Sequence, residues 1–138
     1  MNATALALVG YIVWMIVLLV FFAALRSALT LTGKRAANAY NPSGADVSPF
    51  SERLCRAHAN CYESFPILGG LLLLALATQN TSITNPLAFV VLGARLGQST
   101  IHLISTSVPA VLVRFTLFLT QVGIALYWAF LFAGRFGV

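Results

Sequence analysis

Four polar side chains in an otherwise apolar part of the chain have the spacing of one helix face. Arg53, Arg56, Asn60 and Glu63 follow one another at intervals of three, four and three residues. At roughly 100° per residue, these intervals place them within about 80° around a helix axis. The stripe runs directly into an apolar segment, so its groups must face protein, water or a ligand rather than lipid. Its chemistry suits a small, anionic, hydrophilic ligand.

A second polar set lies further along the chain. Arg95, Gln98 and His102 are three and four residues apart, and Arg114 follows them. Counted from the turn between the second and third helices, Arg95 lies about five residues deeper than Glu63, roughly 7 Å at 1.5 Å per residue. An extended arginine spans that distance, and an isolated buried carboxylate would otherwise take up a proton. We therefore predict a structural ion pair between Glu63 and Arg95.

The composition of the chain indicates a membrane protein. Its 138 residues are 59% hydrophobic and 8% charged, with a mean hydropathy of +0.91. A soluble domain of this length could not bury so much apolar surface, so a single membrane domain over residues 1–138, in contact with the lipid bilayer, is predicted. The net charge of +5 does not indicate nucleic acid, because no basic patch with interleaved aromatics lies outside the apolar runs. No metal-ligand spacing is present, so no metal site is predicted.

The apolar runs and their boundaries predict an all-α chain. The four expected helices cover about residues 3–31, 49–78, 86–105 and 109–132. Ser48-Pro49 and Asn85-Pro86 each have the pattern of an N-cap followed by proline at the first helical position. The links after the second and third helices are short, which favours an up-down-up-down four-helix transmembrane bundle.

The basic residues set the expected orientation. Those of the first loop and its flanks are Arg26, Lys34, Arg35, Arg53 and Arg56. The second loop has none, and Arg114 enters the fourth helix from the third-loop side. Basic residues mark the cytoplasmic side, so loops 1 and 3 are expected in the cytoplasm and both termini on the opposite side. Apart from Arg135, the ionisable residues of the second, third and fourth helices lie in the cytoplasmic half, so they predict a polar cavity that opens to the cytoplasmic leaflet.

A purely structural interpretation applies to several of these residues. Glu63 and Arg95 can serve to link helices, because buried polar groups hold helices together in membranes. Arg53 can extend to the interface, and His58, which points off the stripe, is favoured as interfacial. A ligand role is favoured for three residues: Arg56, Asn60 and Arg114.

The segment from Arg56 to Pro66 also resembles a known family signature. It reads Arg-Ala-His-Ala-Asn-Cys-Tyr-Glu-Ser-Phe-Pro. This Arg-x-x-x-Asn-x-x-Glu-x-x-Pro spacing resembles that of the membrane-associated proteins in eicosanoid and glutathione metabolism (MAPEG). That family includes microsomal glutathione transferases, leukotriene-forming synthases and the microsomal prostaglandin E synthase. Asn41-Pro42, Arg95 and Arg114 fit as well, so the resemblance covers nearly the whole chain.

The resemblance implies a homotrimer with glutathione as cosubstrate, bound between neighbouring subunits near the cytosolic side. Arg114 resembles the family's thiolate-stabilising arginine and is the predicted catalytic residue. An arginine lowers the pKa of a thiol by favouring the thiolate, which is the nucleophile. Arg56, Asn60 and Glu63 match family positions that contact glutathione. The full predicted glutathione-binding set is Arg53, Arg56, Asn60, Glu63, Gln98 and His102.

Some positions depart from the family pattern. Family members often carry tyrosines after the second-helix glutamate and along the third helix, where this chain has Ser64, Gln98 and His102.

The predicted function is glutathione-dependent transferase or peroxidase chemistry on small lipophilic electrophiles or lipid hydroperoxides. The alternative is a catalytically silent membrane protein of the same fold that binds another anionic or lipid ligand. A transporter subunit is a further alternative, disfavoured because the outer halves of the second and third helices are uncharged.

Overall fold

Four long helices make up the protein in the computed structural model, which describes residues 2–138. They are α1 (Ala3–Leu31), α2 (Pro49–Ala77), α3 (Thr81–Ile104) and α4 (Val108–Phe136). Each is long and apolar enough to cross a membrane. The chain is therefore an all-α, multi-pass integral membrane protein, as the composition predicts.

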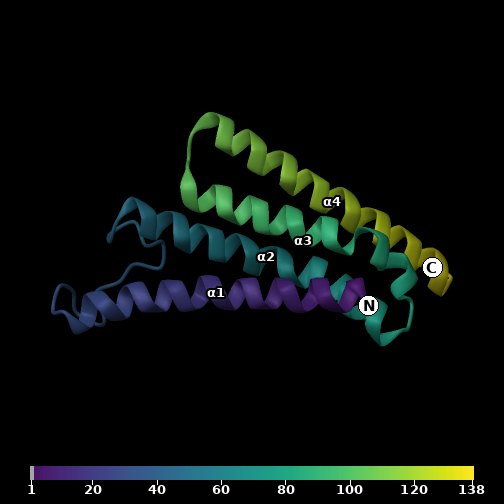
Figure 1. Ribbon diagram of the computed structural model, residues 1–138, viewed down its shortest axis with the longest axis horizontal. Helices are drawn as coiled ribbons and strands as arrows, with labels where there is room; N and C mark the ends of the chain where they lie inside the picture. Colours follow the sequence, from purple (N-terminus) through teal and green to yellow (C-terminus); the bar gives the residue numbers. More distant parts are fainter. Residues whose placement is uncertain (1) are drawn as a thin grey trace.

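The helices run up and down in an antiparallel arrangement (Figure 1). The α1–α2 loop and the α3–α4 turn lie at one end, while both termini and the α2–α3 turn lie at the other. Within residues 2–138, α3 contacts each of the other helices, whereas α1 and α4 do not touch. This places α4 on the outer side of α3 and leaves a seam between α2 and α4.

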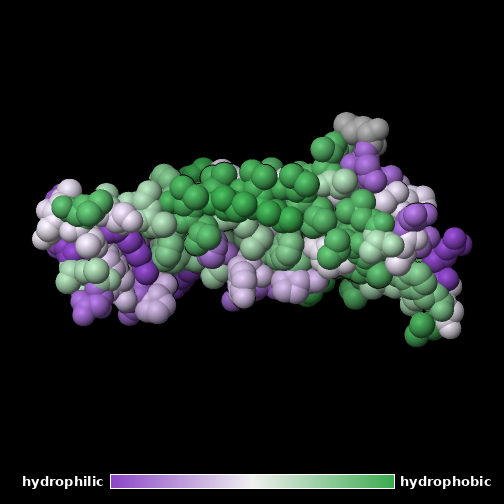
Figure 2. Space-filling model, turned by 90° about the horizontal axis from the view of Figure 1, so that it is seen from below, coloured by the Kyte–Doolittle hydropathy of each residue, from purple (hydrophilic) through white to green (hydrophobic). Residues whose placement is uncertain are grey.

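The outer faces of the helices carry large apolar side chains. Val20 on α1 and Phe130 on α4 are 60% and 76% exposed. Figure 2 shows a face whose middle is mainly hydrophobic and whose two ends are hydrophilic. This distribution matches the bilayer, where lipid replaces water around the middle of the bundle.

The start of α2 is confirmed at Ser48-Pro49. The Ser48 hydroxyl accepts a hydrogen bond from the backbone N–H of Ser51 at 3.0 Å, and Pro49 is the first helical residue. Proline suits this position because its missing N–H would have no partner in the first turn of a helix. Pro66 lies inside the same helix, as predicted.

The predicted start of α3 at Asn85-Pro86 is wrong. The helix begins at Thr81, and Pro86 lies within it. The Asn85 side chain is engaged elsewhere, since its Oδ1 accepts hydrogen bonds from the backbone N–H of Thr4 at 2.9 Å and the Thr4 hydroxyl at 2.7 Å. The earlier start shortens the α2–α3 turn to residues 78–80.

The α1–α2 loop is closed by an ion pair between Arg35 and Asp46. The Asp46 carboxylate also accepts a hydrogen bond from the backbone N–H of Asn41 at 3.1 Å. Desolvation favours the neutral acid, but the hydrogen bonds and the Arg35 charge outweigh it and hold the pKa of Asp46 below its ordinary value of 3.8. The Tyr40 ring lies 5.0 Å from the Arg26 guanidinium, which attaches the loop to α1.

Candidate functional site: a polar pocket beside α2, α3 and α4

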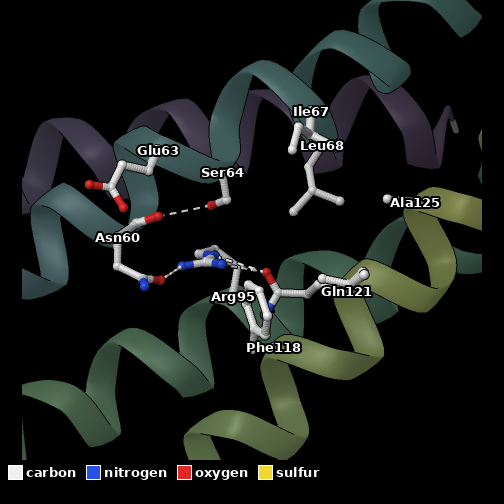
Figure 3. A pocket seen from close by; sticks show the side chains of 10 residues that line it. Asn60, Glu63, Ser64, Ile67, Leu68, Arg95, Phe118, Gln121 and Ala125 are labelled. Atoms are coloured by element: carbon white, nitrogen blue, oxygen red, sulfur yellow. Dashed lines mark hydrogen bonds between the residues drawn. The ribbon is translucent and has the colours of Figure 1, made fainter.

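Arg95, which is 1% exposed, is the centre of the polar pocket. Its Nε and Nη2 donate to Oε1 of Gln121 on α4, at 2.9 and 2.7 Å. Its Nη1 donates to Oδ1 of Asn60 on α2 at 2.5 Å. Figure 3 shows the guanidinium directed between these two amides. One side chain from α3 therefore joins three helices.

The amides that hold Arg95 are themselves fixed. Gln121 Nε2 donates to Gln98 Oε1 at 2.8 Å and to the carbonyl of Leu117 at 3.0 Å. Gln98 Nε2 in turn donates to Asn60 Oδ1 at 3.3 Å. Gln98 and Gln121 are buried. The network leaves little freedom of rotation to its members, so the guanidinium is held in one orientation.

Among residues 2–138, no carboxylate forms an ion pair with Arg95. The chain has three acidic residues, and two of them, Asp46 and Glu52, pair with other arginines. In the described part of the chain, no carboxylate oxygen lies within 4.0 Å of the Arg95 nitrogens. A buried charge with neutral partners alone is costly in a low-dielectric interior, and an opposite charge relieves that cost. An anionic ligand beside Arg95 would therefore be stabilised by this charge.

The predicted ion pair between Glu63 and Arg95 is not formed. Glu63 is exposed on α2, and Figure 3 shows its carboxylate apart from the guanidinium. The prediction compared only how deep the residues of α2 and α3 lie in the bundle, and it did not include α4. Gln121 on α4 accepts hydrogen bonds from two of the three guanidinium nitrogens. Asn60 takes the third nitrogen. The residues predicted to form the pair nevertheless line one cavity.

That cavity has a volume of about 180 Å³ and lies between α2 and α4. Asn60, Glu63 and Arg95 line its polar part, and Ile67 and Phe118 are among its apolar residues. A polar part beside an apolar part suits a ligand that carries both kinds of group.

A second cavity, of about 280 Å³, brings Arg114 to the same region. Arg114 lines it together with Asn60 and Gln98, so the two cavities share Asn60. Arg114 Nε is buried and, within residues 2–138, has no hydrogen-bond partner. A buried donor without a partner is uncommon in a folded protein and is available to a ligand.

The other predicted binding residues lie nearer the start of α2 and the end of α3. Arg53 Nε donates to the carbonyl of Leu103 at 2.9 Å and so links α2 to the last turn of α3. Arg56 is exposed and pairs with Glu52 at 2.7 Å. His102 is buried near the end of α3. From the predicted set, Asn60, Glu63 and Gln98 line the two cavities beside Arg95 and Arg114. Arg53, Arg56 and His102 are not among the residues that line these two cavities.

Two residues that contact Arg95 are absent from the predicted set. Gln121 follows Arg114 by seven residues, a spacing that returns to the same helix face and could have indicated it. Tyr11, on α1, donates its hydroxyl hydrogen to the carbonyl of Cys61 at 2.9 Å and lies 2.6 Å from the Ser64 hydroxyl. Nothing in the apolar sequence around Tyr11 indicates that it contacts α2 beside Asn60.

The comparison with known families identifies a family that covers most of the chain. The model of the MAPEG family matches residues 4–134 of the 138-residue chain, a range that includes parts of all four helices. No curated protein and no solved structure matches the chain.

Proposed function

Since the chain belongs to the MAPEG family, we propose that it is a glutathione-dependent membrane enzyme of the transferase or peroxidase type. Its second substrates are lipophilic electrophiles or lipid hydroperoxides. The observation that carries the proposal is the buried charge of Arg95, which has neutral partners and lies against a cavity. Glutathione carries two carboxylates and, once its thiol ionises, a third negative group.

The charges around the cavities fit a zwitterionic peptide with an excess of negative groups. Arg95 binds the Asn60 amide, and Arg114 lines the neighbouring cavity beside the same residue. Positive charge therefore approaches Asn60 from α3 and from α4. Glu63, in the wall of the first cavity, offers a carboxylate to the single ammonium group of glutathione. These residues can bind the cosubstrate without a metal ion in the proposed arrangement.

Arg114 is the proposed catalytic residue. Its guanidinium favours the thiolate form of bound glutathione over the thiol, because an adjacent positive charge lowers a thiol pKa. A third cavity of about 470 Å³ lies along the same seam between α2 and α4. Its wall is apolar and includes Gly70, Leu74 and Leu126. A lipophilic substrate entering from the bilayer would meet the thiolate where the polar and apolar cavities adjoin, so positioning supplies much of the catalysis.

Both proposed reactions begin with attack by the thiolate. In the transferase reaction a sulfur–carbon bond forms, and the leaving group departs or a strained ring opens. In the peroxidase reaction a sulfur–oxygen bond forms and the peroxide bond breaks, which gives a sulfenic acid and an alkoxide. The alkoxide takes up the proton released when the thiol ionised and leaves as an alcohol. The thiol of a second glutathione then converts the sulfenic acid to a disulfide and water.

The exposed charges on α2 support an oligomer. Arg56 and Glu63 are exposed in the single chain, although a carboxylate within a membrane-spanning helix is costly when it faces lipid. A second copy of the chain would cover this face and complete the pocket. We propose a homotrimer on the basis of the family, with the α1–α2 loop and the α3–α4 turn in the cytoplasm on the basis of the basic residues.

A silent binding protein is the second candidate, and one observation favours it. Ser64 donates to the carbonyls of Asn60 and Cys61, at 3.0 and 3.2 Å. The Gln98 side chain is bonded to Asn60 and Gln121. The single hydroxyl hydrogen of Ser64 is therefore engaged by the α2 backbone and is not free to stabilise a developing negative charge. If these positions matter for turnover, the protein binds glutathione or another anion and leaves it unchanged.

Turnover of the purified protein in detergent tests the proposal. The assay measures glutathione conjugation to a chromogenic electrophile and glutathione-dependent reduction of a fatty acid hydroperoxide. Arg114→Ala should lower turnover at neutral pH by about tenfold or more, since one unit of thiol pKa changes the thiolate fraction about tenfold. Arg135→Ala is the matched control, because Arg135 lies near the opposite end of α4.

The outcomes separate the candidates. Full turnover of Arg114→Ala would contradict the role given to Arg114. Glutathione binding without turnover in the wild type would favour the silent binding protein.

A further inference from the structure

We propose that Tyr11 is a positioning residue of the pocket, although it comes from α1 and is 1% exposed. Its hydroxyl fixes the turn of α2 that carries Asn60, and its ring fixes the face of the Arg95 guanidinium. The ligand meets Asn60 and Arg95, while Tyr11 acts through both. The importance of this role for glutathione rests on the proposed function.

The turn of α2 before Pro66 lacks one helical hydrogen bond. Proline has no backbone N–H, so the carbonyl of Tyr62, four residues earlier, loses its intrahelical donor. The proline ring also crowds that carbonyl, which is why helices bend at such positions. Asn60 and Cys61 therefore lie directly before the position on α2 where this hydrogen bond is missing.

Side-chain hydroxyl groups bond to the backbone at this turn. The Tyr11 hydroxyl donates to the carbonyl of Cys61 at 2.9 Å and lies 2.6 Å from the hydroxyl of Ser64. Ser64 lies 3.0 Å from the carbonyl of Asn60 and 3.2 Å from that of Cys61. Tyr11 and Ser64 thus form a connected set of hydroxyl groups on the two carbonyls that precede Tyr62. The Tyr11 hydroxyl thus ties α1 to the backbone of α2 directly before the missing hydrogen bond.

The orientation of that turn decides where the Asn60 amide lies. Asn60 Oδ1 accepts from Arg95 Nη1 at 2.5 Å and from Gln98 Nε2 at 3.3 Å. A small rotation of the turn would move Oδ1 away from both donors. The Tyr11 hydroxyl therefore acts on Arg95 through the backbone of α2.

The Tyr11 ring acts on Arg95 directly. The Arg95 Cζ atom lies 5.9 Å from the centre of the Tyr11 ring, within the range of a cation–π interaction. Phe65 packs against the same ring edge to face, with the ring centres 5.2 Å apart. Gln121 and Asn60 hold the edges of the guanidinium, and Tyr11 lies near its carbon. This contact matters more because Arg95 has no carboxylate within 4.0 Å in the part of the chain described.

Two phenylalanine substitutions test the role of the hydroxyl. Tyr11→Phe removes the hydroxyl and keeps the ring, so it should weaken glutathione binding about fivefold in calorimetry. Tyr40→Phe is the matched control, because its hydroxyl is also hydrogen bonded, to Thr30 at 2.9 Å and the carbonyl of Arg26 at 2.8 Å. Tyr40 lies on the α1–α2 loop, so its variant should bind glutathione as the wild type does.

Arginine side-chain NMR supplies a readout that does not depend on glutathione. Arginine labelled with ¹⁵N is incorporated, and the Arg95 signal is assigned by its loss in Arg95→Lys. In the wild type the hydrogen bonds of the guanidinium should keep its Nη signals separate. In Tyr11→Phe they should average or shift, whereas Tyr40→Phe should leave them unchanged.

The combined results decide the proposal. A changed Arg95 signal in Tyr11→Phe supports the positioning role. If the wild type does not bind glutathione but that signal still changes, the proposed function fails and the positioning role stands. If Tyr11→Phe lowers only the melting temperature and leaves the Arg95 signals as in the wild type, Tyr11 is merely structural and the proposal is overturned.

Discussion

Two buried polar clusters in the same bundle differ in charge. The first joins α1 to α3 near the end that holds the termini. Its Thr4 hydroxyl lies 2.6 Å from that of Thr84 and donates to Asn85 Oδ1 at 2.7 Å. The backbone N–H of Thr4 donates to the same oxygen at 2.9 Å. Every group named here is neutral and has a partner.

The second cluster surrounds Arg95 and joins three helices around a positive charge. Its partners Asn60 and Gln121 are neutral, and it lies against a cavity of about 180 Å³. Burial is similar in the two clusters, with Thr4, Thr84 and Arg95 at most 1% exposed. Burial therefore does not separate a polar contact that links helices from one that binds a ligand. The two kinds of contact differ instead in charge, because Arg95 carries a positive charge with neutral partners and lies next to a cavity.

Removing the charge should have the largest effect. Arg95→Met should weaken glutathione binding by about 100-fold, the order expected when a charged hydrogen-bonding group is lost. Calorimetry on protein with a measured melting temperature separates lost binding from lost fold. Wild-type affinity in a folded Arg95→Met protein would remove the distinction between the two clusters.

Double-mutant cycles can identify the partner of the Arg95 charge. They measure the free energy of unfolding of the protein in mixed micelles. Asn60→Ala combined with Arg95→Met should show a coupling energy of about 1–3 kcal/mol, as expected for residues in direct contact. Glu63→Gln combined with Arg95→Met should show a much smaller coupling, because no ion pair joins them. Equal coupling in the two cycles would restore the ion pair that the sequence predicts.

The neutral cluster should respond in stability alone. Thr84→Val keeps the shape of the side chain and removes its hydroxyl, which should lower the free energy of unfolding by about 0.6 kcal/mol, a typical value for a hydrogen bond between helices in membranes. Glutathione affinity should stay within twofold of the wild type. A large loss of affinity would show that the termini end of the bundle takes part in binding.

The smallest effect is expected outside the bundle, at Asp46. Its folded-state pKa lies below the ordinary value of 3.8, so the stabilisation by its ionised form is present above pH 3.8 and is lost as the pH falls through the folded-state pKa. Faster hydrogen exchange of the Asn41 amide in that acidic range would report the loss. Asp46→Asn should remove this pH dependence, and an unchanged pH profile would contradict the assignment.

The sequence predicts the fold well where local signals decide it. Helix number, the start of α2 and the position of Pro66 follow from apolar length, an N-cap and proline chemistry. The start of α3 does not, because Asn85 binds Thr4 on a helix about 80 positions away in the chain. Such a contact between distant segments has no local signal.

The sequence predicts which residues belong to the candidate site better than it predicts which of them form hydrogen bonds to one another. Asn60, Arg95 and Arg114 are indicated by their spacing and by the resemblance to the family. The partner of Arg95 is not, because a choice between Glu63 and Gln121 depends on how α4 lies against α2 and α3. Only packing in three dimensions settles that choice.

Glutathione binding to the purified wild-type protein tests the central claim most directly. A calorimetric titration in detergent, repeated with Arg95→Met, examines whether the pocket around Arg95 holds this anion. The account predicts saturable binding by the wild type and much weaker binding by the variant, which removes the buried positive charge that lines the pocket. No binding to a stable, folded protein would contradict the account and would mean that the family fold here serves a different ligand.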